Sequence, residues 1–312
     1  MCCTHFQFRH TPMAVWALVA ILALAFMCPV FAADSEMSDV GRAASSLSVT
    51  RNSISFELSI DRALPPPKGT AVLLHGFPGQ RLGMEGWEGQ RALVASLVNA
   101  GYDVVRFNYV GSWGNAGQFS WFGGIEDTQA VLRALRTREA HNLGVDGSRI
   151  VLVGHSYGGW VALMTASRDS SIRCIATMAS ANMGLTGRLM RDDQHFHARR
   201  LAIYEEVLST REPPIRAVSA RALADDLIAH AAAWDLVGHV DQLRSKQLFF
   251  VSAENDSVVP RGVFVQPLLD GLLKSGAAID SATIEGADHD FDQHGAHVND
   301  AIRKWITTKC NL

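Results

Sequence analysis

One segment of this chain reads Val151-Leu152-Val153-Gly154-His155-Ser156-Tyr157-Gly158-Gly159-Trp160. Its first three residues, with residues 149 and 150 before them, form the apolar and β-branched run expected of a strand that is covered on both faces. Residues 160–166 contain no helix breaker and fit a buried helix. The Gly-x-Ser-x-Gly between them is therefore predicted to form a sharp strand-to-helix turn with Ser156 at its tip.

A turn of this kind suits a nucleophilic serine. A serine hydroxyl attacks well only when it is held out of the surface, beside a general base and near backbone N–H groups that stabilise the developing negative charge. The flanking glycines leave space where the backbone is strained and a neighbouring strand comes close. In a chain with 26 glycines the pentapeptide alone is weak, but its position between strand and helix makes Ser156 the candidate nucleophile.

The composition is that of one large folded domain. The chain has 312 residues, of which 48% are apolar and 19% are charged, enough for a single sizeable core. The formal net charge is −3, which argues against nucleic acid as a partner.

The first 33 residues form a different kind of segment. Arg9 precedes an apolar run over residues 13–27, and Val30-Phe31-Ala32 has small residues where a signal peptidase would cut. We predict a signal peptide over residues 1–32, a mature chain that begins at Ala33, and export to the periplasm or the medium. The alternative is an uncleaved anchor over residues 13–33, and only in that case is the membrane a partner.

Two of the five cysteines, Cys174 and Cys310, lie beyond the predicted signal peptide. An oxidising compartment permits a disulfide between them. Cys174 also fits the commoner role of a small buried apolar residue. The sequence leaves the two alternatives open.

The rest of the chain alternates strands and helices. Residues 34–46 are small and polar and are expected to be a flexible leader, and residues 47–60 suggest a short hairpin. Apolar strand patterns then follow at residues 70–74, 104–109, 150–153, 172–178, 248–252 and 279–284. Helical patterns separate them, so we expect an α/β fold with a mostly parallel sheet and helices on both faces.

One connection, residues 182–246, is too long for an ordinary crossover. It contains two helical patterns, at 194–208 and 218–234. One of them is surplus to the sheet, so we predict a small helical cap insertion over about residues 183–215 within a domain that spans 33–312. Its four arginines fit either a solvated helix face or an anion-recognition site; they are Arg188, Arg191, Arg199 and Arg200.

Two more motifs follow Ser156 in chain order. Residues 248–260 read Leu-Phe-Phe-Val-Ser-Ala-Glu-Asn-Asp-Ser-Val-Val-Pro, and residues 284–291 read Ile-Glu-Gly-Ala-Asp-His-Asp-Phe. With these motifs, residues 45–305 resemble the α/β-hydrolase superfamily, most closely its serine esterases and its members similar to acylaminoacyl peptidases. The resemblance implies that Asp256 is the orienting carboxylate and that His289 is the general base.

Each of these two assignments has competitors. Glu254 lies nearer the end of its strand than Asp256 does, while Asp288 and Asp290 flank His289. Adjacent side chains usually point apart, so neither aspartate easily orients the ring of its neighbour. His155 is expected to turn inward and bond the backbone; His294 and His297 fall on a predicted C-terminal helix.

The oxyanion of an acyl-transfer intermediate needs N–H donors. The backbone N–H of Tyr157 is one expected donor, and the resemblance of Leu74-His75-Gly76-Phe77-Pro78-Gly79 to the family's His-Gly loop implies Phe77 as the second. Four aromatic residues either line an acyl pocket or belong to the core: Trp113, Phe119, Trp121 and Phe122.

The function expected from these residues is that of an exported serine hydrolase that cleaves carboxylic esters through an acyl-enzyme on Ser156, Asp256 and His289. Its substrate would be a small-molecule ester or a short peptide. The alternatives are a serine peptidase or amidase on short peptides, an acyltransferase with the same three residues, and a non-catalytic binding protein. No cofactor is expected. No metal site is indicated, because the mature chain has no His-x-x-x-His pair on a helix and no cysteine pair at ligand spacing.

Overall fold

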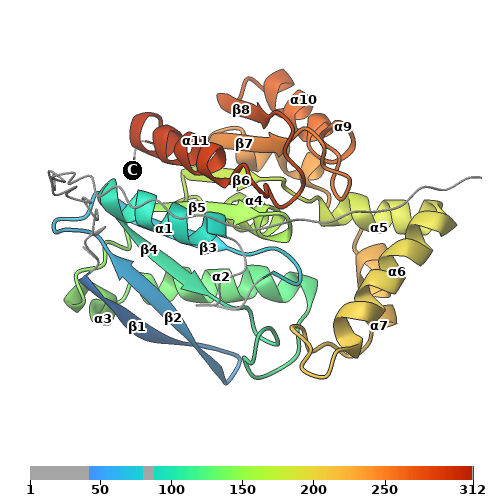
Figure 1. The fold of residues 1–312 in the computed structure, drawn as a ribbon, viewed down its shortest axis with the longest axis horizontal. Coiled ribbons are helices and arrows are strands. Elements are labelled where there is room, and N and C mark those ends of the chain that lie inside the picture. The colour runs from blue at the N-terminus through green and yellow to red at the C-terminus, as the bar shows by residue number, and fades with distance from the viewer. Residues whose placement is uncertain (1–41, 80–87, 311) are drawn as a thin grey trace, which may run out of the picture. The chain divides into compact units, whose positions relative to one another are not determined.

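The computed structural model describes residues 42–79, 88–310 and 312 (Figure 1). The predicted signal peptide, its cleavage site and the alternative anchor all lie outside these residues. Within them, no helix combines the length and the apolar character needed to span a membrane.

The described residues form one sheet with the strand order β1-β2-β4-β3-β5-β6-β7-β8. The strands are β1 (Arg42–Arg51), β2 (Ile54–Arg62), β3 (Gly69–Leu74), β4 (Tyr102–Phe107), β5 (Ile150–His155), β6 (Cys174–Met178), β7 (Gln247–Ala253) and β8 (Ile279–Ile284). Strand β2 runs antiparallel to β1 and β4, and every other neighbouring pair is parallel. The predicted mostly parallel α/β sheet is therefore confirmed.

The N-terminal hairpin begins earlier than the sequence suggests. Strand β1 starts at Arg42, so the expectation of a flexible leader as far as residue 46 is wrong for its last five residues. Ser45 and Ser46 pair with Ile60 and Ser59 of β2. This pairing uses backbone groups, which a small polar residue supplies as well as an apolar one.

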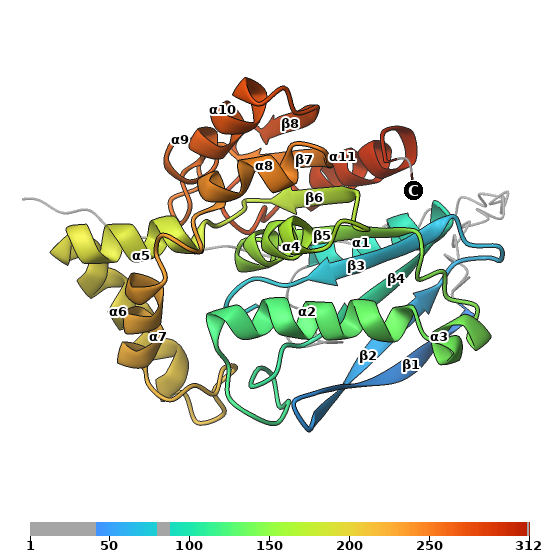
Figure 2. The ribbon, with the colours of Figure 1, turned by 180° about the vertical axis from the view of Figure 1, so that it is seen from behind.

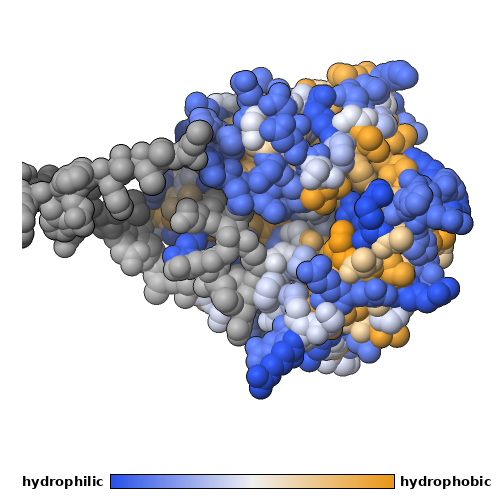
Figure 3. Space-filling model, turned by 45° about the vertical axis from the view of Figure 1, so that its right-hand side comes forward, coloured by the Kyte–Doolittle hydropathy of each residue, from blue (hydrophilic) through white to orange (hydrophobic). Residues whose placement is uncertain are grey.

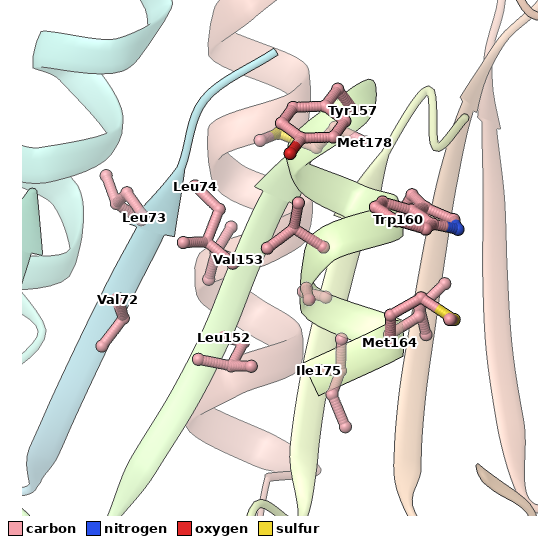
Figure 4. Packing of buried hydrophobic residues seen from close by; sticks show 14 of the residues in the cluster. Val72, Leu73, Leu74, Leu152, Val153, Tyr157, Trp160, Met164, Ile175 and Met178 are labelled. Atoms are coloured by element: carbon pink, nitrogen blue, oxygen red, sulfur yellow. The ribbon is translucent and has the colours of Figure 1, made fainter. Parts of the chain in front are cut away.

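Helices cover both faces of the sheet. They are α1 (Glu88–Asn99), α2 (Trp121–Leu135), α3 (Arg138–Asn142), α4 (Tyr157–Arg168), α8 (Val240–Leu243), α9 (Arg261–Phe264), α10 (Gln266–Lys274) and α11 (Gly295–Thr308), with a 3₁₀ turn η1 (Leu236–His239). Helices α1 and α11 lie on one face (Figure 1), and α2 and α4 lie on the other (Figure 2). Figure 4 shows α4 lying against the central strands, and its Trp160 and Met164 belong to the same buried cluster as Val153 of β5. This contact fixes the start of α4 relative to the end of β5.

Three helices lie between β6 and η1: α5 (Met183–Asp192), α6 (Gln194–Ser209) and α7 (Ala220–Ala229). They stand together at one end of the sheet in both ribbon views (Figures 1 and 2). The sequence pattern does not indicate α5, because Gly184 and Gly187 lower its helix propensity. A Cβ on Gly187 would lie 1.9 Å from the carbonyl oxygen of Leu227, so the close packing of α5 on α7 requires glycine there.

Cys174 and Cys310 form a disulfide, with their Cα atoms 5.7 Å apart. Of the two alternatives that the sequence leaves open, the structure therefore has the bridge. It ties the segment after α11 to the first residue of β6, at the end of the strand opposite to Met178.

Candidate active site

Ser156 stands between β5 and α4, with φ 54° and ψ −118°. A non-glycine residue with this backbone is strained by about 1–3 kcal/mol and persists only where its surroundings hold it. The Ser156 N–H donates to the carbonyl of Met178 at 2.9 Å, and the Ser156 carbonyl accepts the N–H of Gly159 at 3.0 Å and that of Ala181 at 3.0 Å. The elbow is thus fixed on both sides by the ends of neighbouring elements.

The two glycines of the motif provide clearance, as the sequence predicts. A Cβ on Gly154 would lie 2.2 Å from the Gly158 carbonyl oxygen, and a Cβ on Gly158 would lie 2.0 Å from that of Leu74. Any larger residue at either position would push β5, α4 and the end of β3 apart.

The structure brings Ser156, His289 and Asp256 together at the carboxyl ends of β5, β8 and β7. The Nε2 atom of His289 lies 3.0 Å from Ser156 Oγ, and its Nδ1 atom lies 2.9 Å from Asp256 Oδ2. A carboxylate only accepts hydrogen bonds, so Nδ1 carries the hydrogen and Nε2 is left to accept from the serine hydroxyl. This tautomer is the one that can take a proton from Ser156.

Asp256 is buried, with 7% of its surface exposed. Burial by itself would raise the pKa of its carboxyl group. The hydrogen bond and charge of His289, together with the backbone N–H groups of Val258 and Val259, outweigh burial and bring the pKa of Asp256 below its ordinary value. Asp256 therefore stays ionised at neutral pH, where it can stabilise a protonated His289.

The competing acids occupy other positions. Glu254 accepts the N–H of Gly286 at 2.8 Å and so joins the loop after β7 to the loop after β8. Asp288 accepts the N–H of Asp292 at 3.0 Å within its own loop. The Asp290 side chain is 68% exposed and lies 4.0 Å from His155 rather than at the ring of His289. None of the three lies where Asp256 does.

The predicted oxyanion donors border the same cavity. Tyr157 is the first residue of α4, whose leading N–H groups have no partner within the helix. Phe77 lies in the loop after β3, and both residues line the cavity beside Ser156. In that loop His75 Nδ1 lies 2.8 Å from the carbonyl oxygen of Gly76. The Gly76 carbonyl belongs to the same peptide unit as the Phe77 N–H, so this bond fixes the direction of the N–H as well.

The cavity has a volume of about 430 Å³ and its walls are largely apolar. Phe77, Trp121 and Tyr204 form one wall, with ring centroids 4.7 Å apart for Phe77 and Trp121 and 5.5 Å apart for Trp121 and Tyr204. Of the four aromatic residues considered for an acyl pocket, Trp121 lines the cavity. The other three are not among its lining residues. Trp113 and Phe119 contact residues that do line it, Pro78 and Trp121, while Phe122 stacks on Trp234.

Helices α5 and α6 supply cavity residues that the sequence did not single out, namely Ile203 and Tyr204 of α6 and Met183 of α5. Arg200 of α6, one of the four arginines considered above, also lines the cavity. The i, i+3, i+4 spacing of the three α6 residues marks one helix face, which was the available signal. Figure 3, in which this end of the molecule faces the viewer, shows apolar patches among hydrophilic surface. Two apolar residues of the cavity wall are also exposed to solvent, Ile203 at 43% and Val258 at 40%.

The arginines of the insertion make internal contacts. Arg200 donates to the carbonyl of Val258 at 2.8 Å, which links α6 to the loop that carries Asp256. Arg188 pairs with Asp235 at 2.6 Å, and Arg191 pairs with Asp192 at 2.8 Å. These contacts favour structural roles for the two paired arginines.

Among the described residues, the group that could hold a metal ion is His155, His289 and Asp290. Both ring nitrogens of His289 already face Ser156 and Asp256. A metal ion on this group would have to displace the serine or the carboxylate, so the geometry favours the hydrogen-bonded arrangement.

Comparison with known proteins shows which family this chain resembles. The model of the alpha/beta hydrolase family matches residues 71–301. No curated protein matches the sequence significantly.

Solved structures share the fold at low sequence identity. Est1E from Butyrivibrio proteoclasticus is 19% identical, with a TM-score of 0.58 over 84% of this chain and 97% of its own. The acylaminoacyl peptidase from Pyrococcus horikoshii is 13% identical, with a TM-score of 0.62 over 86% of this chain. A puromycin-hydrolysing peptidase from Mycobacterium tuberculosis is 15% identical, with a TM-score of 0.62 over 86% of this chain. This chain covers only 41% and 39% of those two peptidases. Since the family match spans most of the chain, the protein belongs to the alpha/beta hydrolase family.

Proposed function

We propose that this protein is a serine hydrolase that cleaves carboxylic esters through an acyl-enzyme. The observation that carries the proposal is the continuous set of hydrogen bonds from Ser156 Oγ through His289 to Asp256, at 3.0 Å and 2.9 Å. The set lies beside a largely apolar cavity whose lining residues include Phe77 and Tyr157.

In this mechanism Ser156 Oγ attacks the carbonyl carbon of the ester while His289 Nε2 takes the hydroxyl proton. The N–H groups of Phe77 and Tyr157 stabilise the oxyanion, and Asp256 stabilises the imidazolium of His289. The imidazolium returns its proton to the departing alkoxide, which leaves as an alcohol, and Ser156 keeps the acyl group. Water then attacks the acyl-enzyme with His289 again as base, and the carboxylic acid is released.

An ester of a compact apolar acid fits the site better than a long peptide does. The cavity of about 430 Å³ is bounded by α5 and α6 and is walled by aromatic and aliphatic side chains. The structural match also covers 97% of the Est1E chain, but only 39% and 41% of the two peptidase chains. These observations favour ester hydrolysis over the peptidase alternative. Water is the simplest acceptor of the acyl group from Ser156 in the second step.

A substrate panel tests the proposal. The mature protein should react with a fluorophosphonate probe and hydrolyse p-nitrophenyl esters, with kcat/KM falling once the acyl chain outgrows the cavity. Aminoacyl p-nitroanilides should be much poorer substrates. A higher kcat/KM on the anilides would replace the esterase proposal with the peptidase one, and acyl transfer to an added alcohol faster than to water would favour an acyltransferase.

We also propose that the protein is exported. The Cys174–Cys310 disulfide supports this, because disulfides persist in oxidising compartments and are rare in the cytosol. N-terminal sequencing of the protein from the producing cells should give Ala33. An intact Met1 in the membrane fraction would instead indicate the uncleaved anchor.

A further inference from the structure

His155, the residue before the nucleophile, lies between the two loops that complete the site. As the last residue of β5, its side chain points to the face opposite Gly154, whose missing Cβ faces Gly158. On this face its Nδ1 lies 3.3 Å from where a Cβ on Gly76 would be, in the loop that carries Phe77. Its ring also lies 5.1 Å from the ring of His289, centroid to centroid.

The ring makes a specific contact with the backbone of the proposed base. The Nε2 atom of His155 lies 2.9 Å from the carbonyl oxygen of His289. A carbonyl only accepts, so Nε2 of His155 is the donor. This bond fulfils the expectation that His155 bonds the backbone, and it joins residues 155 and 289 directly across the site.

The loop around His289 needs such a contact because its backbone is irregular. Gly286 and Phe291 have φ of 71° and 56°, and Asp288 and Asp290 are exposed. On the side toward β7, Asn255 N–H donates to the Ala287 carbonyl at 2.8 Å. On the side toward the nucleophile, His155 provides the bond.

We infer that His155 is a positioning residue, whose Nε2–H holds the backbone of His289 at the distance at which the imidazole reaches Ser156 Oγ. The inference rests on the proposed function. A displacement of about 1 Å in a reacting group can lower the rate on the order of 100-fold, so a single backbone contact at this point has a large effect on kcat.

The charge state of His155 is consistent with this role. Burial, and next the positive charge that His289 can carry, lower the pKa of His155 to about 4; the His289 carbonyl and the carboxylates of Asp290 and Asp256 act in the opposite direction. The His155 ring is therefore neutral at neutral pH. It donates its hydrogen bond without adding a positive charge beside the imidazolium.

Three substitutions separate the hydrogen bond from the space that the ring fills. In His155→Gln the amide nitrogen extends about as far from Cβ as Nε2 does, so the donor is kept. His155→Asn also carries an amide, but it is too short to reach the His289 carbonyl. His155→Phe keeps a ring and loses the donor. The matched control is His239→Phe, since His239 Nε2 also lies 3.0 Å from a carbonyl oxygen, that of Ala233, away from the site.

Steady-state kinetics on one p-nitrophenyl ester, with thermal unfolding of each variant, test the inference. Wild-type turnover comes first: its absence would contradict the proposed function and not this inference. We expect kcat to fall roughly 10- to 100-fold in His155→Asn and His155→Phe, and by no more than about threefold in His155→Gln, with KM changing by less than about threefold throughout. His239→Phe should match the wild type.

Equal loss of kcat in His155→Gln and His155→Asn, at equal thermal stability, would overturn the inference, because it would mean that the donor does not matter. Full kcat in His155→Phe would overturn it too. If His155→Phe does not fold, the comparison of the two amide variants still decides, because both are polar and smaller than histidine.

Discussion

The elbow around Ser156 and the two loops that carry Asp256 and His289 meet at one site but are built differently. The elbow lies between a fully buried strand and a buried helix, and backbone bonds to Met178 and Ala181 fix it. The two loops are largely exposed and are held by a few hydrogen bonds, among them that of Asn255 N–H with the Ala287 carbonyl and that of Gly286 N–H with Glu254. At the elbow, the available space therefore determines which residue types fit. In the loops, the residue types are determined by the hydrogen bonds that each side chain must make.

The largest effect should come from the elbow itself. Ser156→Ala removes the nucleophile, so kcat should fall on the order of 10⁶-fold, while the free energy of unfolding changes by no more than about 1–2 kcal/mol. Ester turnover and urea denaturation of the same preparation measure both. Normal turnover in this variant would rule out the serine mechanism.

The next largest effect should come from the loops. Asp256→Asn keeps the shape but can favour the wrong tautomer of His289, and in a related geometry this change costs about 10⁴-fold in kcat. Glu254→Gln, Asp288→Asn and Asp290→Asn are matched controls that should each cost far less. If Glu254→Gln lost most of its kcat while Asp256→Asn stayed active, the carboxylate that orients His289 would be Glu254.

A glycine substitution tests how rigid the elbow is. Gly158→Ala places a Cβ 2.0 Å from the carbonyl oxygen of Leu74, and backbone on both sides prevents an easy shift. We expect a loss of roughly 3 kcal/mol in the free energy of unfolding. The control is Gly262→Ala, where a Cβ meets nothing within 4 Å; there the change should be within about 1 kcal/mol and in the stabilising direction. Equal free energies of unfolding for Gly158→Ala and Gly262→Ala would mean that the backbone around the elbow can shift to accommodate a Cβ.

The last effect concerns the pH dependence of stability near the oxyanion loop. Burial lowers the pKa of His75 to about 4, so between pH 6.5 and 4 the unfolded chain binds a proton that the folded chain does not. His75 therefore makes the protein less stable as pH falls through this window, by up to about 3 kcal/mol. Asp127, whose pKa burial raises to about 6, contributes the opposite slope, so the test is a difference between variants.

His75→Asn keeps a donor for the Gly76 carbonyl and cannot titrate, so its unfolding free energy should fall less between pH 6.5 and 4 than that of the wild type. Urea denaturation at several pH values measures the two slopes. His297→Asn, on the exposed face of α11, should leave the wild-type slope unchanged. Parallel slopes for His75→Asn and the wild type would show that His75 is not a neutral buried group.

The same contrast between the elbow and the loops explains how much of the fold and of the candidate site the sequence could predict. The sheet and the elbow follow from apolar runs and one short motif, whereas the assignment of Asp256 and His289 came from the resemblance to the α/β-hydrolase superfamily. The start of β1 could not be predicted because polar residues pair through their backbone. Helix α5 could not be predicted because Gly187 serves packing on α7 and Gly184 serves packing on the segment that follows α7. The cavity wall from α6 and the bond from His155 to the His289 carbonyl depend on contacts between distant segments.

The most direct test of the central claim is to trap the acyl group. The mature protein would be mixed with p-nitrophenyl acetate, quenched with acid within the first turnover, digested and analysed by peptide mass. The mechanism predicts a burst of p-nitrophenol equal to the enzyme concentration and an acetyl group on the peptide that contains Ser156. Full turnover with no acyl peptide, or an acetyl group on another residue, would contradict it.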